Sequence, residues 1–174
     1  REDRGTLDQI FILDEVLSKR YEQKLDTCCA FIDVRKAYDR VWRPGLWFKL
    51  HSMGVRGRCL QLLRTMFDKV TRAVRVNGAL TEAFDVTAGV PQGCVLSPIL
   101  YATYIDGLHE ALERSGLGVR LYGRHIPLLL YADDIVLLAR SPAELQKMLQ
   151  VLEDYASKWR FQVNLTKSEV VVVS

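Results

Sequence analysis

Two adjacent aspartates, Asp133 and Asp134, lie in the middle of a strongly apolar segment of this chain. Residues 128–138 are otherwise almost all aliphatic, which predicts a buried strand on each side of a break. Two neighbouring carboxylates close to a hydrophobic core are costly unless they bind cations or other partners. A tight turn between two strands would place both at one exposed sheet edge, where hard divalent cations such as Mg²⁺ take carboxylate ligands. On this segment alone, a simple polar hairpin tip explains the pair equally well.

A third carboxylate, Asp33, ends a second apolar run, Ala30-Phe31-Ile32, and is followed by a basic and aromatic turn that contains Arg35 and Tyr38. If this strand neighbours the strands around Asp133-Asp134 in one sheet, three carboxylates converge on one edge. Three acids that close together repel one another strongly unless cations neutralise them. Two metal ions held there would serve in-line phosphoryl or nucleotidyl transfer.

A glycine-rich loop, Gly89-Val90-Pro91-Gln92-Gly93, leads into Cys94-Val95-Leu96-Ser97-Pro98. Its two glycines flank Pro-Gln and allow the backbone to approach a ligand closely. Ser97-Pro98 then predicts a helix, with Ser97 as N-cap and Pro98 at the first helical position. Because a helix N-terminus favours anionic groups, the loop and the helix together predict a cradle for an anionic substrate.

The elements that must position these residues follow from hydrophobic spacing and turn signals. We expect helices over residues 7–25, 58–69, 97 to about 114 with a stop at Gly116, and from Ser141 onward, plus a short helix that follows Pro44-Gly45 and ends near Gly54. We expect strands over 27–34, 119–122, 127–131, 135–139, 161–164 and 169–173, with 119–122 joined to 127–131 as a hairpin through Gly123-Arg124. Asn77-Gly78 predicts another hairpin over 71–86. Mixed helices and antiparallel strands without βαβ alternation indicate an α+β fold in one domain.

Length and composition bound the remaining possibilities. The chain has 174 residues, of which 49% are hydrophobic and 26% charged, as in an ordinary globular domain. No apolar run reaches the roughly 18 residues of a membrane helix, and the N-terminus is no signal peptide. The four cysteines lack zinc-type spacing, which favours an intracellular protein with reduced thiols. Without an initiator Met, the sequence is expected to be a fragment of a longer polyprotein.

Charge is distributed unevenly along the chain. The net charge is +3, yet residues 35–75 hold eleven Lys or Arg against two Asp or Glu. A basic block inside a folded segment indicates a surface that faces a polyanion. A solvated helix face is the alternative explanation.

Taken together, the three chemical segments resemble the palm motifs of reverse transcriptases. Phe31-Ile32-Asp33 with Lys36-Ala37-Tyr38-Asp39 is similar to the first motif, Gly89-Val90-Pro91-Gln92-Gly93 with Leu96-Ser97-Pro98 to the second, and Tyr131-Ala132-Asp133-Asp134 (YADD) to the third. Asn164 with Lys167-Ser168 is similar to the fourth, which is a shorter match. Gly5-Thr6-Leu7-Asp8-Gln9-Ile10, Val41-Trp42 with Leu46, and Val76-Asn77-Gly78 resemble the non-LTR (LINE-type) retrotransposon enzymes.

The resemblance implies a role for each matching residue. Asp33, Asp133 and Asp134 would form the catalytic triad and bind two Mg²⁺ ions, for which Mn²⁺ is a possible substitute, with the Val34 carbonyl as a further ligand. Tyr38 would exclude a ribose 2′-hydroxyl and so select deoxynucleotides, although a packed core tyrosine is the structural alternative. Gln92 and Gly93 would contact the incoming nucleotide, Lys167 would help pyrophosphate leave, and Tyr131 would lie near the primer terminus.

The resemblance also implies partners and architecture. The fold would be a polymerase palm, an antiparallel sheet packed on helices, with part of the fingers and without the thumb, all within residues 1–174. Its partners would be an RNA template, a DNA primer and dNTPs, with no membrane; the fragment alone would be weakly active or inactive. A LINE-type element would act in the nucleus after a cytoplasmic ribonucleoprotein stage. Candidates for phosphate contacts are Arg56, Arg58, Arg64, Lys69, Arg72 and Arg75.

Two alternatives stay open at this stage. One is another polymerase, namely a group II intron or retron reverse transcriptase, or a viral RNA-dependent RNA polymerase, against which Gln92 and Tyr38 argue. The other is a domesticated, inactive palm that acts as an RNA-binding module. All three acids are intact, which argues against such decay.

Overall fold

A computed structural model describes residues 6–174 of the chain. These residues group into two compact units, one made of the residues up to Arg35 together with Asp106–Ser174, and the other of Lys36–Ile105. The sequence predicts a single palm domain with part of the fingers, and that domain assignment stays a prediction. Of the expected non-LTR details, Gly5 lies outside the described residues.

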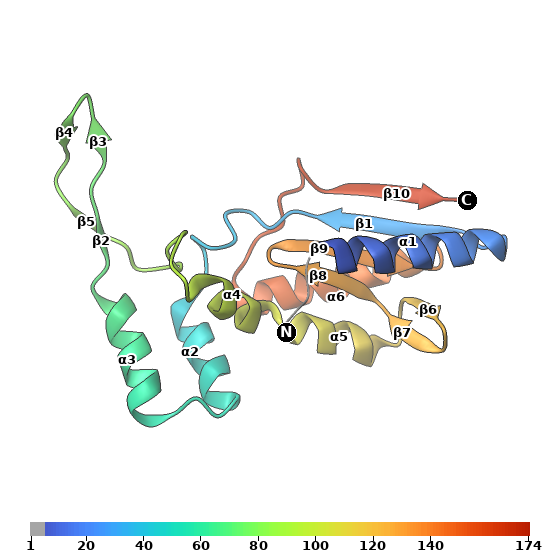
Figure 1. The fold of residues 1–174 in the computed structure, drawn as a ribbon, viewed down its shortest axis with the longest axis horizontal. Helices are drawn as coiled ribbons and strands as arrows, with labels where there is room; N and C mark the ends of the chain where they lie inside the picture. The colour runs from blue at the N-terminus through green and yellow to red at the C-terminus, as the bar shows by residue number, and fades with distance from the viewer. Residues whose placement is uncertain (1–5) are drawn as a thin grey trace. The chain divides into compact units, whose positions relative to one another are not determined.

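A four-stranded antiparallel sheet forms the centre of the first unit (Figure 1). Its order is β10 (Glu169–Val173), β1 (Thr27–Ile32), β9 (Asp134–Ala139), β8 (Leu128–Tyr131). The four strands predicted around these positions are therefore confirmed. In the register, Ile32 lies opposite Ile135, and Tyr131 lies opposite Asp134.

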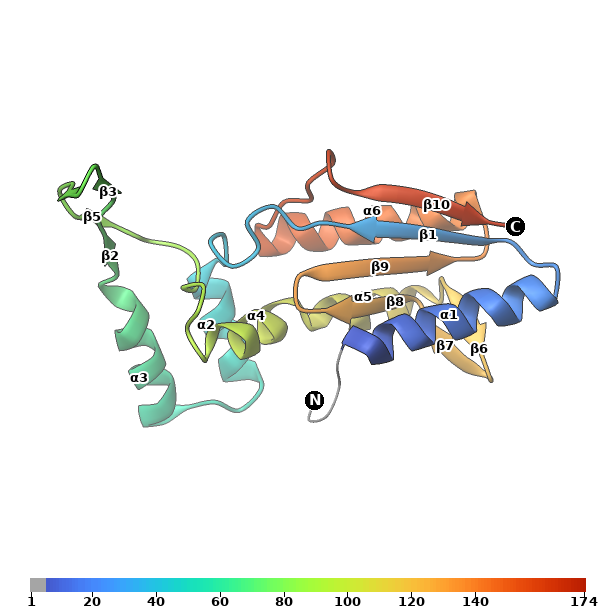
Figure 2. The ribbon, with the colours of Figure 1, turned by 45° about the horizontal axis from the view of Figure 1, so that its top comes forward.

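Helices cover the two faces of this sheet, as Figures 1 and 2 show. Helix α1 (Thr6–Glu22) contacts β8, while α6 (Pro142–Trp159) packs against β1 and β9 and contacts α5 (Gly107–Ser115). Strand side chains alternate between faces. One face contributes Cys29, Leu129 and Leu138 to a buried cluster with Val16 of α1 and Val119.

Two strand predictions are wrong. Strand β6 (Val119–Leu121) pairs with β7 (Arg124–Ile126), and not with 127–131. Tyr122 and Gly123 both have positive φ, at 50° and 75°, which is the geometry of a tight two-residue turn. Residues 161–164 form no strand, and only an isolated bridge joins Val163 to Val34.

The second unit contains three helices and two small two-stranded antiparallel sheets. Its helices are α2 (Arg43–Ser52), α3 (Gly57–Asp68) and α4 (Ser97–Ile105). Strand β2 (Thr71–Arg72) pairs with β5 (Phe84–Asp85), and β3 (Arg75–Val76) pairs with β4 (Ala79–Leu80). Asn77 and Gly78 have φ of 50° and 87°, so the predicted Asn-Gly turn is confirmed.

Two helix predictions need correction. Pro44 and Gly45 lie inside the first turn of α2 instead of before it, because a proline lacks only an N–H that has no helical partner there. The helix expected over 97 to about 114 is two helices, α4 and α5, interrupted at Asp106. Gly107, a poor helix residue, follows that interruption. The stop at Gly116 is confirmed, with φ of 67° at the C-cap.

The N-terminus of α6 is built around a buried carboxylate, Glu144. Ser141 Oγ accepts a hydrogen bond from the Glu144 amide at 3.2 Å, as the capping sequence predicts. The Glu144 carboxylate accepts from the amides of Arg140 at 2.6 Å and Gly118 at 3.1 Å and from the Arg140 side chain. Burial alone would raise the pKa of Glu144, but these hydrogen bonds outweigh that effect and lower the pKa to about 2.

Because of this carboxylate, the stability of the fold depends on pH in the acid range. Its pKa lies below the ordinary 4.5, so its contribution is complete above pH 4.5 and is lost as the pH falls toward about 2. We expect Glu144→Gln to lower the free energy of unfolding at neutral pH by up to about 3 kcal/mol. Urea denaturation at pH 7 and across the acid range measures this. Glu153→Gln, an exposed change in the same helix, is the control; equal losses in the two variants would refute the role of Glu144.

No helix within residues 6–174 combines the length and the apolar character needed to cross a membrane.

Candidate active site

Asp33 and Asp134 lie at the same end of two neighbouring strands, β1 and β9, in the central sheet. Asp33 follows the last residue of β1, and Asp134 is the first residue of β9. Since Ile32 pairs with Ile135, the antiparallel register carries on to place Asp33 beside Asp134. Side chains alternate along a strand, so Asp33 shares a face with Phe31 and Cys29, and Asp134 with Val136 and Leu138. Both carboxylates are therefore on the face that α1 partly covers.

Asp133 sits in the two-residue turn between β8 and β9, as the sequence predicts. Tyr131 pairs with Asp134, which leaves Ala132 and Asp133 as the turn residues. Ala132 has φ of 52°, a conformation that usually favours glycine. Backbone held in such a region is costly and is concentrated at functional sites.

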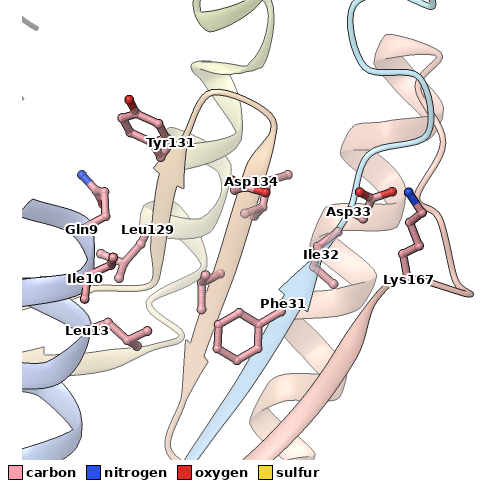
Figure 3. A pocket seen from close by; sticks show the side chains of 12 residues that line it. Gln9, Ile10, Leu13, Phe31, Ile32, Asp33, Leu129, Tyr131, Asp134 and Lys167 are labelled. Carbon is pink, nitrogen blue, oxygen red and sulfur yellow. The ribbon is translucent and has the colours of Figure 1, made fainter. Parts of the chain in front are cut away.

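A pocket of about 340 Å³ opens beside these carboxylates. Figure 3 shows Asp33, Asp134 and Tyr131 at its rim, and Lys167 pointing toward Asp33. Its floor is apolar and is lined by residues of the sheet and of α1, namely Ile10, Leu13, Phe31, Ile32, Leu129, Ile135 and Val136. The site thus offers negative charge at the edge of a low-polarity surface, where electrostatic interactions are strengthened.

A short turn after α6 holds Asp33 through hydrogen bonds with Asn164 and Ser168, and we call this arrangement the Asn164 clasp. Asn164 Nδ2 donates to Asp33 Oδ2 at 2.9 Å, and the Asn164 amide donates to the Asp33 carbonyl at 2.8 Å. The Asp33 amide donates to Ser168 Oγ at 3.1 Å. Thr166 Oγ1 donates to Asn164 Oδ1 at 2.8 Å, which turns the amide nitrogen toward Asp33. Sequence reasoning noted Asn164 and Ser168 as a motif but assigned them no role, and this clasp supplies one.

The Val34 carbonyl takes no part in the hydrogen bonds of the β-bridge between Val34 and Val163. The bridge is closed by the Arg35 amide, which donates to the Gln162 carbonyl, and by the Asn164 amide on the Asp33 carbonyl. In an antiparallel pair of this kind, the carbonyl of the central residue points to the other side. This geometry suits the predicted metal ligand.

The three carboxylates influence one another electrostatically. Burial raises the pKa of Asp134 above its ordinary value, and the negative charges of Asp133 and Asp33 raise it further. Their oxygens, with the Val34 carbonyl, are the hard ligands that Mg²⁺ and Mn²⁺ prefer. Across residues 6–174, however, no three His, Cys, Asp or Glu side chains are gathered closely enough to hold one ion in their present positions. The donor set fits a divalent cation in kind, and mutual repulsion of the acids favours their separation.

The remaining predicted nucleotide contacts lie in the second unit. The Tyr38 ring stacks on Tyr101, with centroids 5.0 Å apart. The Val90 amide donates to the Tyr38 carbonyl at 2.8 Å, so the tyrosine segment is tied to the glycine-rich loop. Gln92 and Gly93 are exposed, and Gly93 has φ of 84° with open space where a Cβ would lie. Backbone conformation, more than close packing, therefore requires glycine at position 93.

The predicted capping role of Ser97 is wrong. Ser97 is buried in the first turn of α4, and its Oγ donates to the Pro91 carbonyl at 2.6 Å. The hydroxyl thus anchors the loop that carries Gln92 instead of capping the helix. This contact still serves the predicted cradle.

All six basic residues proposed for phosphate contacts are exposed in the second unit. Arg56, Arg58, Arg64 and Lys69 lie on α3 or at its ends, and Arg72 and Arg75 lie on β2 and β3. Arg72 also pairs with Asp39 at 3.5 Å. Their exposure is compatible with a polyanion-facing surface.

The whole chain, residues 1–174, matches the family model described as reverse transcriptase (RNA-dependent DNA polymerase). The chain belongs to the reverse transcriptase family. This confirms the reverse transcriptase family predicted from the three motifs.

Curated relatives of this reverse transcriptase domain come from mobile elements. The chain is 29% identical over 173 residues to the RNA-directed DNA polymerase from mobile element jockey of Drosophila funebris, covering 96% of the chain and 18% of the relative. It is 31% identical over 172 residues to the probable RNA-directed DNA polymerase from transposon X-element of Drosophila melanogaster, covering 95% and 18%. The chain spans about a fifth of the length of these relatives. These relatives agree with the non-LTR likeness predicted from the motifs.

Solved telomerase structures show the same reverse transcriptase fold. A telomerase from Candida albicans, in complex with a fragment of telomeric RNA, superposes with a TM-score of 0.71 at 18% identity, covering 97% of this chain and 31% of that chain. Apo telomerase from Candida tropicalis, truncated from its C-terminal domain, gives 0.65 at 18% identity, over 97% and 35%. These matches confirm the predicted α+β polymerase palm.

Proposed function

We propose that this chain carries the reaction centre of an RNA-directed DNA polymerase that copies a non-LTR retrotransposon. The observation that carries the proposal is the register that sets Asp33 beside Asp134 on one face, with Asp133 in the adjoining turn. These three carboxylates, from two distant sequence segments, would supply the negative charge that nucleotidyl transfer requires. The nucleus would be the site of action.

Divalent cations, Mg²⁺ or in its place Mn²⁺, would be held by Asp33, Asp133, Asp134 and the Val34 carbonyl. When bound, two such ions lower the pKa of the primer 3′-hydroxyl and neutralise charge on the triphosphate. The protein's own task is positioning, because phosphoryl transfer leaves little covalent chemistry for side chains to do. Asn164 and Ser168 hold Asp33 from behind through the hydrogen bonds described above.

The pocket residues would orient the reactants. Tyr131, 40% exposed at the rim, would lie against the primer terminus. Lys167, at the same rim, would offer a positive charge to the leaving pyrophosphate. In the second unit, Tyr38 would exclude a ribose 2′-hydroxyl, while Gln92 and Gly93 would contact the incoming deoxynucleotide.

An RNA template, a DNA primer and dNTPs are the partners this function needs. The exposed basic residues from Arg56 to Arg75 would contact template or primer phosphates, which position the duplex without reading its sequence. Such binding weakens steeply with salt.

Primer extension tests the proposed function. The full-length protein is supplied with a DNA primer annealed to an RNA template, Mg²⁺, and either dNTPs or rNTPs. We expect templated extension with dNTPs and far less with rNTPs. Efficient extension with rNTPs alone, or binding of the primer–template with no extension under any divalent cation, would contradict the proposal.

The Asn164 clasp yields a prediction of its own. Asn164→Ala removes the hydrogen bond to Asp33 Oδ2, and partners behind a metal ligand are worth about 10- to 100-fold in metal affinity or activity. We expect a fall of that size in the extension rate, partly restored by raising the Mg²⁺ concentration. Thr166→Val, which removes only the hydroxyl that orients Asn164, is expected to give a smaller loss. An unchanged Mg²⁺ dependence in Asn164→Ala would show that the clasp does not position Asp33.

A further inference from the structure

One buried arginine, Arg43, gathers the backbone that leads into the Gln92 loop. The residue is 7% exposed, and its guanidinium donates four hydrogen bonds, all to main-chain carbonyls of the second unit. Nε donates to Gly89 at 2.8 Å and Nη2 to Ala88 at 3.2 Å. Nη1 donates to Val86 at 2.8 Å and to Phe67 at 2.6 Å.

Arginine suits this position through its shape. Its planar group has five N–H donors in a fixed fork, which a lysine ammonium cannot reproduce. The Phe67 carbonyl belongs to the last turn of α3, where the helix dipole favours a cation. The guanidinium also lies over the Phe67 ring, 5.9 Å from its centre. Together these contacts offset the cost of burying the charge.

The segment that Arg43 holds has little other regular structure. Residues 86–93 contain no helix or strand. Two further hydrogen bonds tie this segment to the chain just before Arg43, since the Gly89 amide donates to Val41 at 2.9 Å and the Val90 amide donates to Tyr38 at 2.8 Å. At Gly89, where φ is 83°, an added Cβ would lie 2.5 Å from the Asp39 carbonyl oxygen. The loop and the tyrosine segment therefore press closely against each other.

We propose that Arg43 is a positioning residue for nucleotide selection, because it locks the Gln92 loop onto the Tyr38 segment and makes the two one rigid cradle. The inference rests on the proposed polymerase function. Arg43 touches no reacting group; it holds the loop through the backbone at Val86, Ala88 and Gly89 and is itself anchored to the Phe67 carbonyl of α3. Without its guanidinium the three loop carbonyls lose their donor, and only the Gly89–Val41 and Val90–Tyr38 hydrogen bonds still join the loop to the tyrosine segment, so the two are held less rigidly.

Two variants of the full-length protein separate this role from a general effect on folding. Arg43→Met keeps the length of the side chain and removes every donor, and Arg43→Lys keeps the charge but loses the fork. Arg120→Met, an exposed arginine on β6 in the other unit, is the matched control. If Arg43→Met does not fold, Arg43→Lys gives the same test in milder form.

Amide hydrogen exchange reads the position of the loop without requiring any activity. We expect the Gly89 and Val90 amides to exchange faster in the Arg43 variants, while the amides of β1 and β9 keep their protection. Arg120→Met should change neither. Equal protection of Gly89 and Val90 in the wild type and both Arg43 variants would overturn the inference, as would a loss of protection spread evenly over both units.

Steady-state extension kinetics measure the consequence for nucleotide selection. We expect the KM for dNTPs to rise about 10-fold or more in Arg43→Met, with a smaller change in kcat, and the preference for dNTPs over rNTPs to fall by a similar factor. A fall in kcat with KM and nucleotide preference unchanged would contradict a role in nucleotide selection. If the wild-type protein makes no DNA, the proposed function fails, while the exchange pattern still decides whether Arg43 positions the loop.

Discussion

An Asp133→Asn variant of the full-length protein is expected to lose RNA-templated DNA synthesis almost completely, with kcat/KM lowered at least about 1000-fold. Asp133 occupies the turn between β8 and β9, next to Asp134 and at the same edge as Asp33. Asparagine keeps the shape of the side chain but removes its charge, so the site loses one of the three carboxylates that would neutralise a divalent cation. Primer extension under saturating dNTPs and Mg²⁺ measures the loss.

The same variant should remain folded. Burial raises the pKa of Asp134, and the charges of Asp133 and Asp33 raise it further, which means that Asp134 is repelled by both neighbouring acids. Removing one of them therefore relieves repulsion, and asparagine is well tolerated in turns. We expect circular dichroism and primer–template binding to match the wild type. Asp154→Asn, an exposed change on α6, serves as the control and should leave extension unchanged.

Asp33 offers an independent version of this test. Asp33→Ala should be as inactive as Asp133→Asn, although it also removes the acceptor for Asn164 Nδ2. Near-normal DNA synthesis by either variant would rule out the sheet edge as the reaction centre.

A Tyr38→Ala variant should use ribonucleotides, with the preference for dNTPs over rNTPs reduced at least about 10-fold. The Tyr38 ring is held by stacking on the buried Tyr101, and its carbonyl is bonded to Val90 of the loop that leads to Gln92. A ring fixed in this way can reject one additional oxygen atom by collision. Removing the ring opens that space, while the backbone contact to Val90 persists.

Single-nucleotide incorporation from dNTP and rNTP pairs measures this discrimination. Tyr38→Phe keeps the ring and should keep the selectivity, whereas Tyr122→Ala, an exposed tyrosine of the other unit, is the control for loss of an aromatic side chain. Unchanged selectivity in Tyr38→Ala, accompanied by lower stability, would identify Tyr38 as a packing residue only.

The sheet edge could be predicted from sequence because its signals are local. The apolar strands flanking Asp133-Asp134 and the strand ending at Asp33 follow from alternation and turn chemistry, and their pairing brings two distant segments together. The hairpin partner of 119–122 was not predictable in the same way. Both 124–126 and 127–131 are suitable strands, and the choice depends on Leu128–Tyr131 pairing with β9.

Residues that act through contacts with distant parts of the sequence were harder to predict. Asn164 contacts Asp33 only after the chain has closed the sheet and α6, and no local pattern reports that contact. Arg43 is one of eleven basic residues between 35 and 75, and nothing in the sequence distinguishes its burial. Ser97 was expected to cap its helix, yet the Pro91 carbonyl of the preceding loop takes its hydroxyl. In each case a tertiary partner decides the role.

Cation binding tests most directly whether the three aspartates form the reaction centre. Mn²⁺ can be titrated into a complex of the full-length protein with a dNTP and a primer–template whose primer is terminated at its 3′ end. Electron paramagnetic resonance then counts the bound ions. We predict two tightly bound ions per wild-type protein, as two-metal chemistry requires, and a loss of tight binding in Asp33→Asn and Asp133→Asn. Equal numbers of tightly bound Mn²⁺ ions in the wild type and both variants would contradict the assignment of this sheet edge.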